Sequence, residues 1–192
     1  SECLVGSEMC IRDRAYFFSQ ATTVQEAREE ASMIIDALKG YKISYPVVFD
    51  WETAKGYRTY SGISKSTMTA MAETFCSMVE AAGYKAMIYA NTFDFERFNS
   101  TSLTSRYASW LARYPENYDG NGKRFALGDG IPSLDYPYQI WQYSSTGHVS
   151  GISGYVDMNV GFIGFSGTSS PSVPITFQVP ADEYTIKQGD SI

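Results

Sequence analysis

The sequence predicts an α/β fold, an incomplete TIM-like (β/α) barrel that lacks its first two strands. Strand-like and helix-like segments alternate along the chain, which is the order that produces parallel strands with covering helices. About six strand-like segments can be recognised, whereas a complete barrel has eight strands. Neither G-x-G-x-x-G nor a P-loop follows any of these segments, so a nucleotide-binding open sheet loses its best support.

The first half of the chain carries clear strand and helix signals. Residues 15–19 form a short aromatic strand, and Thr23 and Glu26 have the capping-box spacing that begins a helix. This helix is expected to end at Gly40, because glycine readily takes the conformation found just past a helix C-terminus. The apolar run 46–51 has the length and pattern of a strand that is buried on both faces.

The remaining elements continue the alternation, with long loops in place of some helices. A second helix begins at Ser64 or Ser66 and ends at Gly83. Cys76 falls inside this helix and is expected to be a small core residue. A short helix is expected around 93–99. Further strands are expected at 85–90, 108–113, 139–143 and 155–160.

Both ends of the chain differ from the region between them. Residues 1–14 show neither helical nor strand periodicity, and 4–13 resembles a translated sequencing adapter. We therefore interpret 1–14 as a non-native leader. A Gly/Ser/Pro-rich linker at 166–174 follows the main domain, 15–165. Residues 175–192 then look like the start of a truncated C-terminal module of LysM-like or immunoglobulin-like type.

The composition argues against several classes of function. The 15 basic and 21 acidic residues give a net charge of −6, which disfavours nucleic acid or an anionic membrane as partner. No apolar run approaches the roughly 20 residues of a membrane span. The three cysteines and His148 show no metal-ligand spacing and no nucleophile motif, so we expect neither a metal, a cofactor nor a Ser-His-Asp mechanism.

Two carboxylates close the apolar run in the string YPVVFDWE at 45–52. Because side chains alternate along a strand, Asp50 and Glu52 point to one side, while Trp51 points to the other, toward the core. The Cα atoms of the two acids lie roughly 6.6 Å apart, and like charges this close raise the pKa of one member. One carboxyl can then donate a proton while the other stabilises positive charge, which is what glycoside hydrolysis needs. Barrels carry their chemistry at such strand ends.

Four strings carry a family resemblance that spans roughly 15–165. They are YPVVFDWE, KAMIYAN at 85–91, SWLARY at 109–114 and YQIWQYSSTGHVSGISGYVDMNVGF at 138–162. In this order they resemble the motifs of glycoside hydrolase family 25, the lysozymes (N-acetylmuramidases) of bacteria and phages, and the last string is the most specific. The resemblance implies a modified α/β barrel that hydrolyses, with net retention, the β-1,4 bond between N-acetylmuramic acid and N-acetylglucosamine in peptidoglycan.

The resemblance also implies roles for individual residues. Glu52 matches the general acid/base, and Asp50 matches a group that orients the substrate's N-acetyl group or stabilises the oxocarbenium-like transition state. Asp157, in the string VDMN, matches a further active-site acid. Whether an enzyme carboxylate or the substrate's acetamido oxygen forms the intermediate stays open. Cleft positions that stack on or hydrogen-bond sugars are matched by Tyr89, Trp110, Trp141 and Gln142, with core packing as the alternative for each.

One feature departs from the family pattern. Family members begin with a strand that carries an active-site Asp in a D-x-S-x-x-Q-like motif, which this chain lacks. Because a barrel without two strands exposes two unpaired edges, we expect this 192-residue chain to fold poorly and to be weakly active or inactive, although its parent is a lysozyme. The location of the implied substrate makes the parent a secreted enzyme of the cell wall, or a phage endolysin, and we expect it to be a monomer.

Four other interpretations compete with this one. A family 18 chitinase would need acids where this chain has Tyr45 and Val48. A non-catalytic module could bind cell-wall glycans through its aromatic side chains, with the acids merely solvated. From the carboxylate pair alone, an ordinary acidic loop or a site for Mg²⁺ or Ca²⁺ is also compatible.

Overall fold

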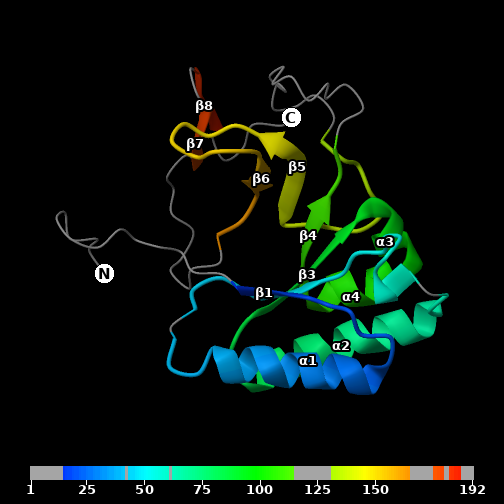
Figure 1. Cartoon of the computed structure of the whole chain (residues 1–192). Coiled ribbons are helices and arrows are strands. Elements are labelled where there is room, and N and C mark those ends of the chain that lie inside the picture. The colour runs from blue at the N-terminus through cyan, green and yellow to red at the C-terminus, as the bar shows by residue number, and fades with distance from the viewer. Residues whose placement is uncertain are drawn as a thin grey trace.

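The computed structural model describes residues 15–41, 43–60, 62–114 and 131–164, together with the backbone of two further strands at 175–179 and 182–186. Its main feature is one curled six-stranded sheet with helices packed against one face (Figure 1). The predicted α/β class and the partial barrel are therefore confirmed. The expected leader, 1–14, and the expected linker, 166–174, lie outside the described residues.

The six strands of the sheet follow one another in chain order. They are β1 (Ala15–Phe18), β2 (Val47–Asp50), β3 (Ala86–Asn91), β4 (Ala108–Ala112), β5 (Ile140–Gly147) and β6 (Val156–Gly161). The first five run parallel, and β6 runs antiparallel to β5. This last pairing departs from the parallel order expected, because the connection 148–155 is too short for a helical crossover.

The first helix, α1 (Val24–Ala37), begins as its capping residues predict. The Thr23 hydroxyl accepts a hydrogen bond from the Glu26 N–H at 3.2 Å. The Glu26 carboxylate reaches back to the N–H of Thr22, at 2.7 Å, one residue before the position that a standard capping box would use. After the helix, Gly40 has a φ of 87°, a conformation that favours glycine.

The second long helix, α2 (Lys65–Ala81), starts after Ser64, whose hydroxyl accepts a hydrogen bond from the Thr67 N–H at 3.2 Å. The choice between the two candidate serines is thereby resolved. The short helix expected around 93–99 is divided into α3 (Thr92–Arg97) and α4 (Ser100–Arg106), and a single 3₁₀ turn, η1 (Arg58–Tyr60), precedes α2.

The main core lies between the sheet and the pair α1 and α2, which run side by side beneath β1 in Figure 1. Phe49 and Trp51 are fully buried there, and Cys76 is buried in the same cluster, so the core positions expected for Trp51 and Cys76 are confirmed. Phe49 packs against both Trp51 and Phe75, with ring centroids 5.9 and 5.0 Å apart. This packing fixes the helix-facing side of β2.

The opposite face of the sheet is the inside of the partial barrel. A smaller apolar cluster, Val48, Met87 and Ile140, fills its floor. Tyr89 and Trp110 pack against this cluster and stand above it toward the carboxyl ends of the strands. The two faces of β2 therefore have different roles. Its odd-numbered residues pack against the helices, and its even-numbered residues face the inside of the partial barrel.

Within the described part of the chain, β1 pairs only with β2 and β6 only with β5, so the sheet is open at both sides. A separate antiparallel pair is formed by β7 (Ile175–Val179) and β8 (Asp182–Ile186). None of the helices in the described ranges combines the length and apolar character that crossing a membrane requires.

Candidate active site

The register of the parallel strands places functional side chains in one row on the inner face. Phe18 lies opposite Asp50, Asp50 lies opposite Tyr89, and Tyr89 lies opposite Trp110. Each of these residues sits at or near the carboxyl end of its strand, and Glu52 follows directly after β2. The row therefore forms where α/β barrels hold their functional groups.

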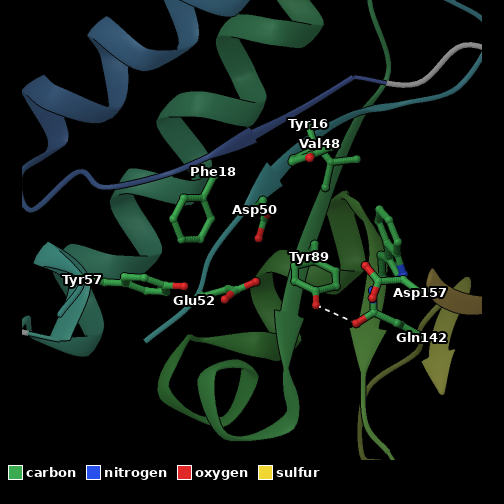
Figure 2. Close-up of a pocket in the computed structure, with 10 residues that line it drawn as sticks. Tyr16, Phe18, Val48, Asp50, Glu52, Tyr57, Tyr89, Gln142 and Asp157 are labelled. Carbon is green, nitrogen blue, oxygen red and sulfur yellow. Dashed lines mark hydrogen bonds between the residues drawn. The ribbon is translucent and has the colours of Figure 1, made fainter. Parts of the chain in front are cut away.

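A cleft of about 450 Å³ opens above this row. In Figure 2, Asp50 and Glu52 approach it from the β2 side, Asp157 and Gln142 approach it from the opposite side, and Tyr89 lies between the two groups. All the predicted site residues except Trp141 line this cleft. It is also lined by four residues that the sequence did not single out, Tyr16, Phe18, Val48 and Tyr57.

Asp50 is the more deeply buried acid of the pair, with only 9% of its surface exposed. Burial, and secondly the neighbouring charge of Glu52, raises the pKa of Asp50 to about 7. Among the described residues, no donor reaches its buried Oδ1. A buried acceptor without a donor is costly, so this atom is suited to receive an N–H or O–H from a ligand in the cleft.

Glu52 is half-buried and extends into the cleft from the loop after β2. Its pKa is raised by burial first and then by the negative charges of Asp94 and Asp157. Its backbone carbonyl accepts a hydrogen bond from the buried Thr59 hydroxyl. The Glu52 carboxyl thus keeps its proton to a higher pH than an ordinary glutamate does, and it also has access to the cleft. A general acid requires both properties.

Gln142 is held by two tyrosines from neighbouring parts of the sheet. The hydroxyl of Tyr89 donates to Gln142 Oε1 at 2.8 Å, and the hydroxyl of Tyr114 donates to the same atom at 2.9 Å. Burial is the main cause that raises the pKa of both tyrosines, so both remain protonated donors at neutral pH. Tyr114 was not among the predicted site residues, although it is the last residue of the string SWLARY.

Asp157 is an exposed residue of β6 and lines the cleft from the far side. Its neighbour on the same face, Asn159, accepts a hydrogen bond from Trp110 Nε1 at 2.8 Å. The Asn159 amide in turn donates to the Asp157 carbonyl at 3.4 Å. These contacts tie the strand that carries Asp157 to β4, across β5.

Trp141 does not line the cleft. It is fully buried, and its Nε1 donates to the Arg113 carbonyl at 2.8 Å. Because Gln142 faces the interior, its neighbour in the strand must face the other way. The predicted contact between Trp141 and a substrate therefore has no support from its position, and the alternative of core packing matches what is observed.

Aromatic side chains that the sequence did not single out form the near wall of the cleft. Tyr16 and Phe18 alternate on β1 and therefore share a face, a signal that the pattern of AYFF already contains. Phe18 meets the ring of Tyr57 edge to face, with centroids 5.0 Å apart. The loop that carries Tyr57 is held by Arg58, which donates to Glu26 at 2.6 Å, and no local pattern could have predicted that pairing.

Nowhere in the described ranges do three or more His, Cys, Asp or Glu side chains gather as a metal site would require. The acids of the cleft instead face aromatic and amide side chains. Such a surface suits a neutral, hydroxyl-rich ligand, because aromatic faces stack on sugar rings and amides bond to hydroxyls.

Comparison with known proteins places this geometry in a family. The model of glycosyl hydrolases family 25 matches residues 7–152. Among curated proteins, the chain is 26% identical over 159 residues to "Uncharacterized protein YegX" of Escherichia coli K12, a match that covers 82% of this chain and 49% of the relative. The chain thus spans about half the length of this curated relative.

Solved structures share the fold. The modular autolysin LytC of Streptococcus pneumoniae, solved with a synthetic peptidoglycan ligand, is 23% identical, with a TM-score of 0.57 over 75% of this chain and 32% of LytC. A lysozyme of Streptomyces coelicolor is 19% identical, with a TM-score of 0.58 over 79% of this chain and 67% of the lysozyme. The family model matches well over half of this chain, and the chain belongs to glycosyl hydrolases family 25.

Proposed function

We propose that this chain is part of a lysozyme that hydrolyses the β-1,4 bond between N-acetylmuramic acid and N-acetylglucosamine in peptidoglycan, with net retention and with Glu52 as general acid/base. The observation that carries the proposal is the pair of strand-end acids, Asp50 and Glu52, facing one cleft with aromatic walls. Family membership supports the reaction class. The peptidoglycan ligand of LytC supports the class of substrate.

In the proposed first step, the Glu52 carboxyl gives its proton to the glycosidic oxygen as the bond from C1 to that oxygen breaks. A nucleophilic oxygen, either of an enzyme carboxylate or of the substrate's own acetamido group, forms a bond to C1 from the opposite face. In the second step a water oxygen attacks C1, the bond between C1 and the nucleophilic oxygen breaks, and the Glu52 carboxylate takes up the proton that the water loses. Two inversions give net retention.

The other two acids have supporting roles in this proposal. Asp50 Oδ1, which no described donor reaches, would accept the N–H of the substrate's acetamido group and so orient it. Asp157, on the far wall, would stabilise the positive charge that develops on the sugar ring. Gln142 and its two tyrosines would hydrogen-bond sugar hydroxyls, and Tyr89 and Trp110 would contact the rings.

The substitution Glu52→Gln tests the proposal. An enzyme loses hydrolysis by about 100-fold or more, because a general acid contributes on that order, while its binding of peptidoglycan is retained. Release of reducing sugar ends from purified cell walls measures hydrolysis, and co-sedimentation with the same walls measures binding. Suppose that the wild type binds cell walls, but that neither this chain nor one with an added first strand releases reducing ends. The non-catalytic glycan-binding module then becomes the better assignment, because the exposed rings of Tyr16 and Phe18 would be enough to bind glycans.

A secreted, bacteriolytic protein that acts outside the cell, or a phage endolysin, follows from the proposed substrate rather than from any contact in the structure. The proposed protein is monomeric, since the three acids that this chain contributes to the proposed reaction all line one cleft.

A further inference from the structure

Asp94, in the first turn of α3, is a charged side chain that the proposed reaction does not use. It is fully buried and does not line the cleft. Its Oδ2 accepts hydrogen bonds from the Thr53 N–H and from Asn91 Nδ2, both at 3.0 Å, and its Oδ1 faces Arg97 at 3.3 Å. Burying a carboxylate costs free energy unless such donors compensate it, so this position requires an explanation.

Capping of α3 does not explain Asp94. Asn91 precedes this helix, and its Oδ1 accepts the Asp94 N–H at 2.9 Å, as a capping residue does. In a capping box, the carboxylate three residues later would return to the backbone N–H of the capping residue. Here it accepts the backbone N–H of Thr53 instead, which belongs to the loop after β2. The carboxylate therefore joins two separate parts of the chain.

The loop that Asp94 holds is the one that carries Glu52. Thr53, the next residue, is bound twice, because its N–H donates to Asp94 and its Oγ1 accepts a 2.8 Å hydrogen bond from Arg97. On the other side, the Trp51 N–H donates to the carbonyl of Tyr89 at 2.9 Å. The backbone is thus anchored immediately before and immediately after Glu52, and Asp94 with Arg97 supplies the anchor that follows it.

Asp94 also lies close enough to Glu52 to act on its proton. Among the groups that interact with Glu52, the Asp94 charge is the largest electrostatic cause that raises the pKa of Glu52, after burial. Asp94 is fully buried, whereas Asp157 is exposed, so water screens the charge of Asp157 more strongly than that of Asp94. The ionisable groups that act on Glu52 or respond to its charge are Asp50 from β2, Tyr89 from β3, Asp94 from α3, Tyr114 after β4 and Asp157 from β6.

We propose that Asp94 is a positioning residue for Glu52, one that clamps the following backbone N–H so that the Glu52 carboxyl stays in the cleft. The catalytic consequence rests on the proposed function, but the clamp itself is a physical property that can be measured without hydrolysis. Asp94 touches no substrate in this proposal, and it acts through Thr53 and through its charge.

The substitution Asp94→Asn removes the charge and keeps the size of the side chain. We expect the pKa of Glu52 to fall, because a nearby negative charge is lost, and the Thr53 amide to exchange its hydrogen about tenfold faster, because a charge-assisted hydrogen bond is weakened. The ¹³C signal of the Glu52 carboxyl, assigned by its absence in Glu52→Gln, gives the first quantity, and amide hydrogen exchange gives the second.

Glu30→Gln is a matched control. Glu30 is a half-buried carboxylate on α1 that holds the loop after the neighbouring strand, accepting from the Ser19 hydroxyl at 2.6 Å and from the Gln20 N–H at 2.9 Å. Its replacement is expected to speed exchange at Gln20 and to leave the Glu52 titration and the Thr53 amide unchanged. A general loss of stability would instead move both variants alike.

Two results overturn the proposal: Asp94→Asn leaves the Glu52 titration unchanged, or the Thr53 amide of the wild type exchanges as fast as an unstructured peptide. The second measurement needs no variant, so it decides the matter even if Asp94→Asn fails to fold. Where hydrolysis is measurable, kcat should fall with KM unchanged, and the alkaline limb of the pH profile should move to lower pH. If no form of the chain cleaves peptidoglycan yet the Glu52 titration shifts as expected, the proposed function fails and the clamp stands.

Discussion

Tyr89 and Gln142 lie on strands that are not neighbours, with β4 between them, yet the Tyr89 hydroxyl donates a 2.8 Å hydrogen bond to Gln142 Oε1. This contact spans the inner face of a curled sheet, since side chains that stand parallel on a flat sheet converge on a concave one. The cleft is therefore a product of the curvature, and the residues that line it depend on one another for their orientation.

We expect Tyr89→Phe and Tyr114→Phe each to weaken the binding of a soluble peptidoglycan fragment by several-fold. Each removes one hydrogen bond, worth about 1 kcal/mol, that fixes the Gln142 amide. Titration calorimetry measures the affinity. Tyr41→Phe, at an exposed tyrosine that does not line the cleft, is the control and should bind as the wild type does. Equal affinity in all three variants would contradict a role for this amide.

The two tryptophans Trp110 and Trp141 should respond to truncation in opposite ways. Trp141→Ala removes a fully buried side chain and is expected to lower the free energy of unfolding by about 3–5 kcal/mol. Trp110→Ala removes a half-buried side chain that lines the cleft, so we expect a smaller loss of stability and a larger loss of glycan affinity. Urea unfolding and fragment binding, measured on both variants, separate the effects. Intact binding by Trp110→Ala would show that this ring serves packing alone.

The stability of the fold should fall as the pH rises from about 4 to 7, and Asp50 is the main reason. Its pKa of about 7 in the folded chain exceeds the ordinary value of an aspartate, so the folded state holds a proton that the unfolded chain releases. A rise of about three units corresponds to up to about 4 kcal/mol. Urea unfolding at pH 4 and pH 8 checks the sign.

The substitution Asp50→Asn should reduce this pH dependence, because the residue that replaces the acid cannot titrate. Some dependence of the same sign should remain, since the pKa of Glu52 is raised as well. A wild-type chain that is more stable at pH 8 than at pH 4 would contradict the assigned burial of Asp50. If Asp50→Asn shows the same difference in stability between pH 4 and pH 8 as the wild type, the pH dependence belongs to another group.

Adding a family-like first strand with its active-site Asp should raise the hydrolysis of cell walls from a very low level. The expectation follows from the unpaired edge of β1, which pairs only with β2 in the described residues. A parallel strand placed there would satisfy backbone donors and cover Tyr16, which is exposed. Release of reducing ends measures the gain. Full activity in the chain without the added strand would refute the expectation that it is weakly active or inactive.

Much of the fold could be predicted from local patterns in the chain. The helix beginnings at Thr23 and Ser64 follow from side chains that bind backbone N–H groups within the next three residues. The strand at Val47–Asp50 follows from an unbroken apolar run. These signals depend on residues close in sequence, which is why a single sequence contains them. The antiparallel β6 could also have been foreseen, because its connection to β5 is short.

The site was harder to predict wherever long-range contacts decide it. Trp141 and Gln142 are adjacent, and only the register of β5 determines which of them faces the cleft. Tyr57 reaches the cleft because Arg58 binds Glu26, a residue 32 positions away in the sequence. Asp94 had no motif of its own, since its partner Thr53 lies 41 positions earlier. Contacts of this kind depend on the three-dimensional fold and produce no periodic pattern in the sequence.

The antiparallel hairpin of β5 and β6 has a practical consequence for altering this protein. Its tip, residues 148–155, can be exchanged or lengthened without moving β2, because β6 pairs with only one strand, β5, in the described residues. Loop grafting at this tip would change the segment that leads into the strand of Asp157, while the paired acids on the other side of the cleft keep their geometry. The hairpin is thus the place where the sequence can be varied with the least disturbance to the paired acids.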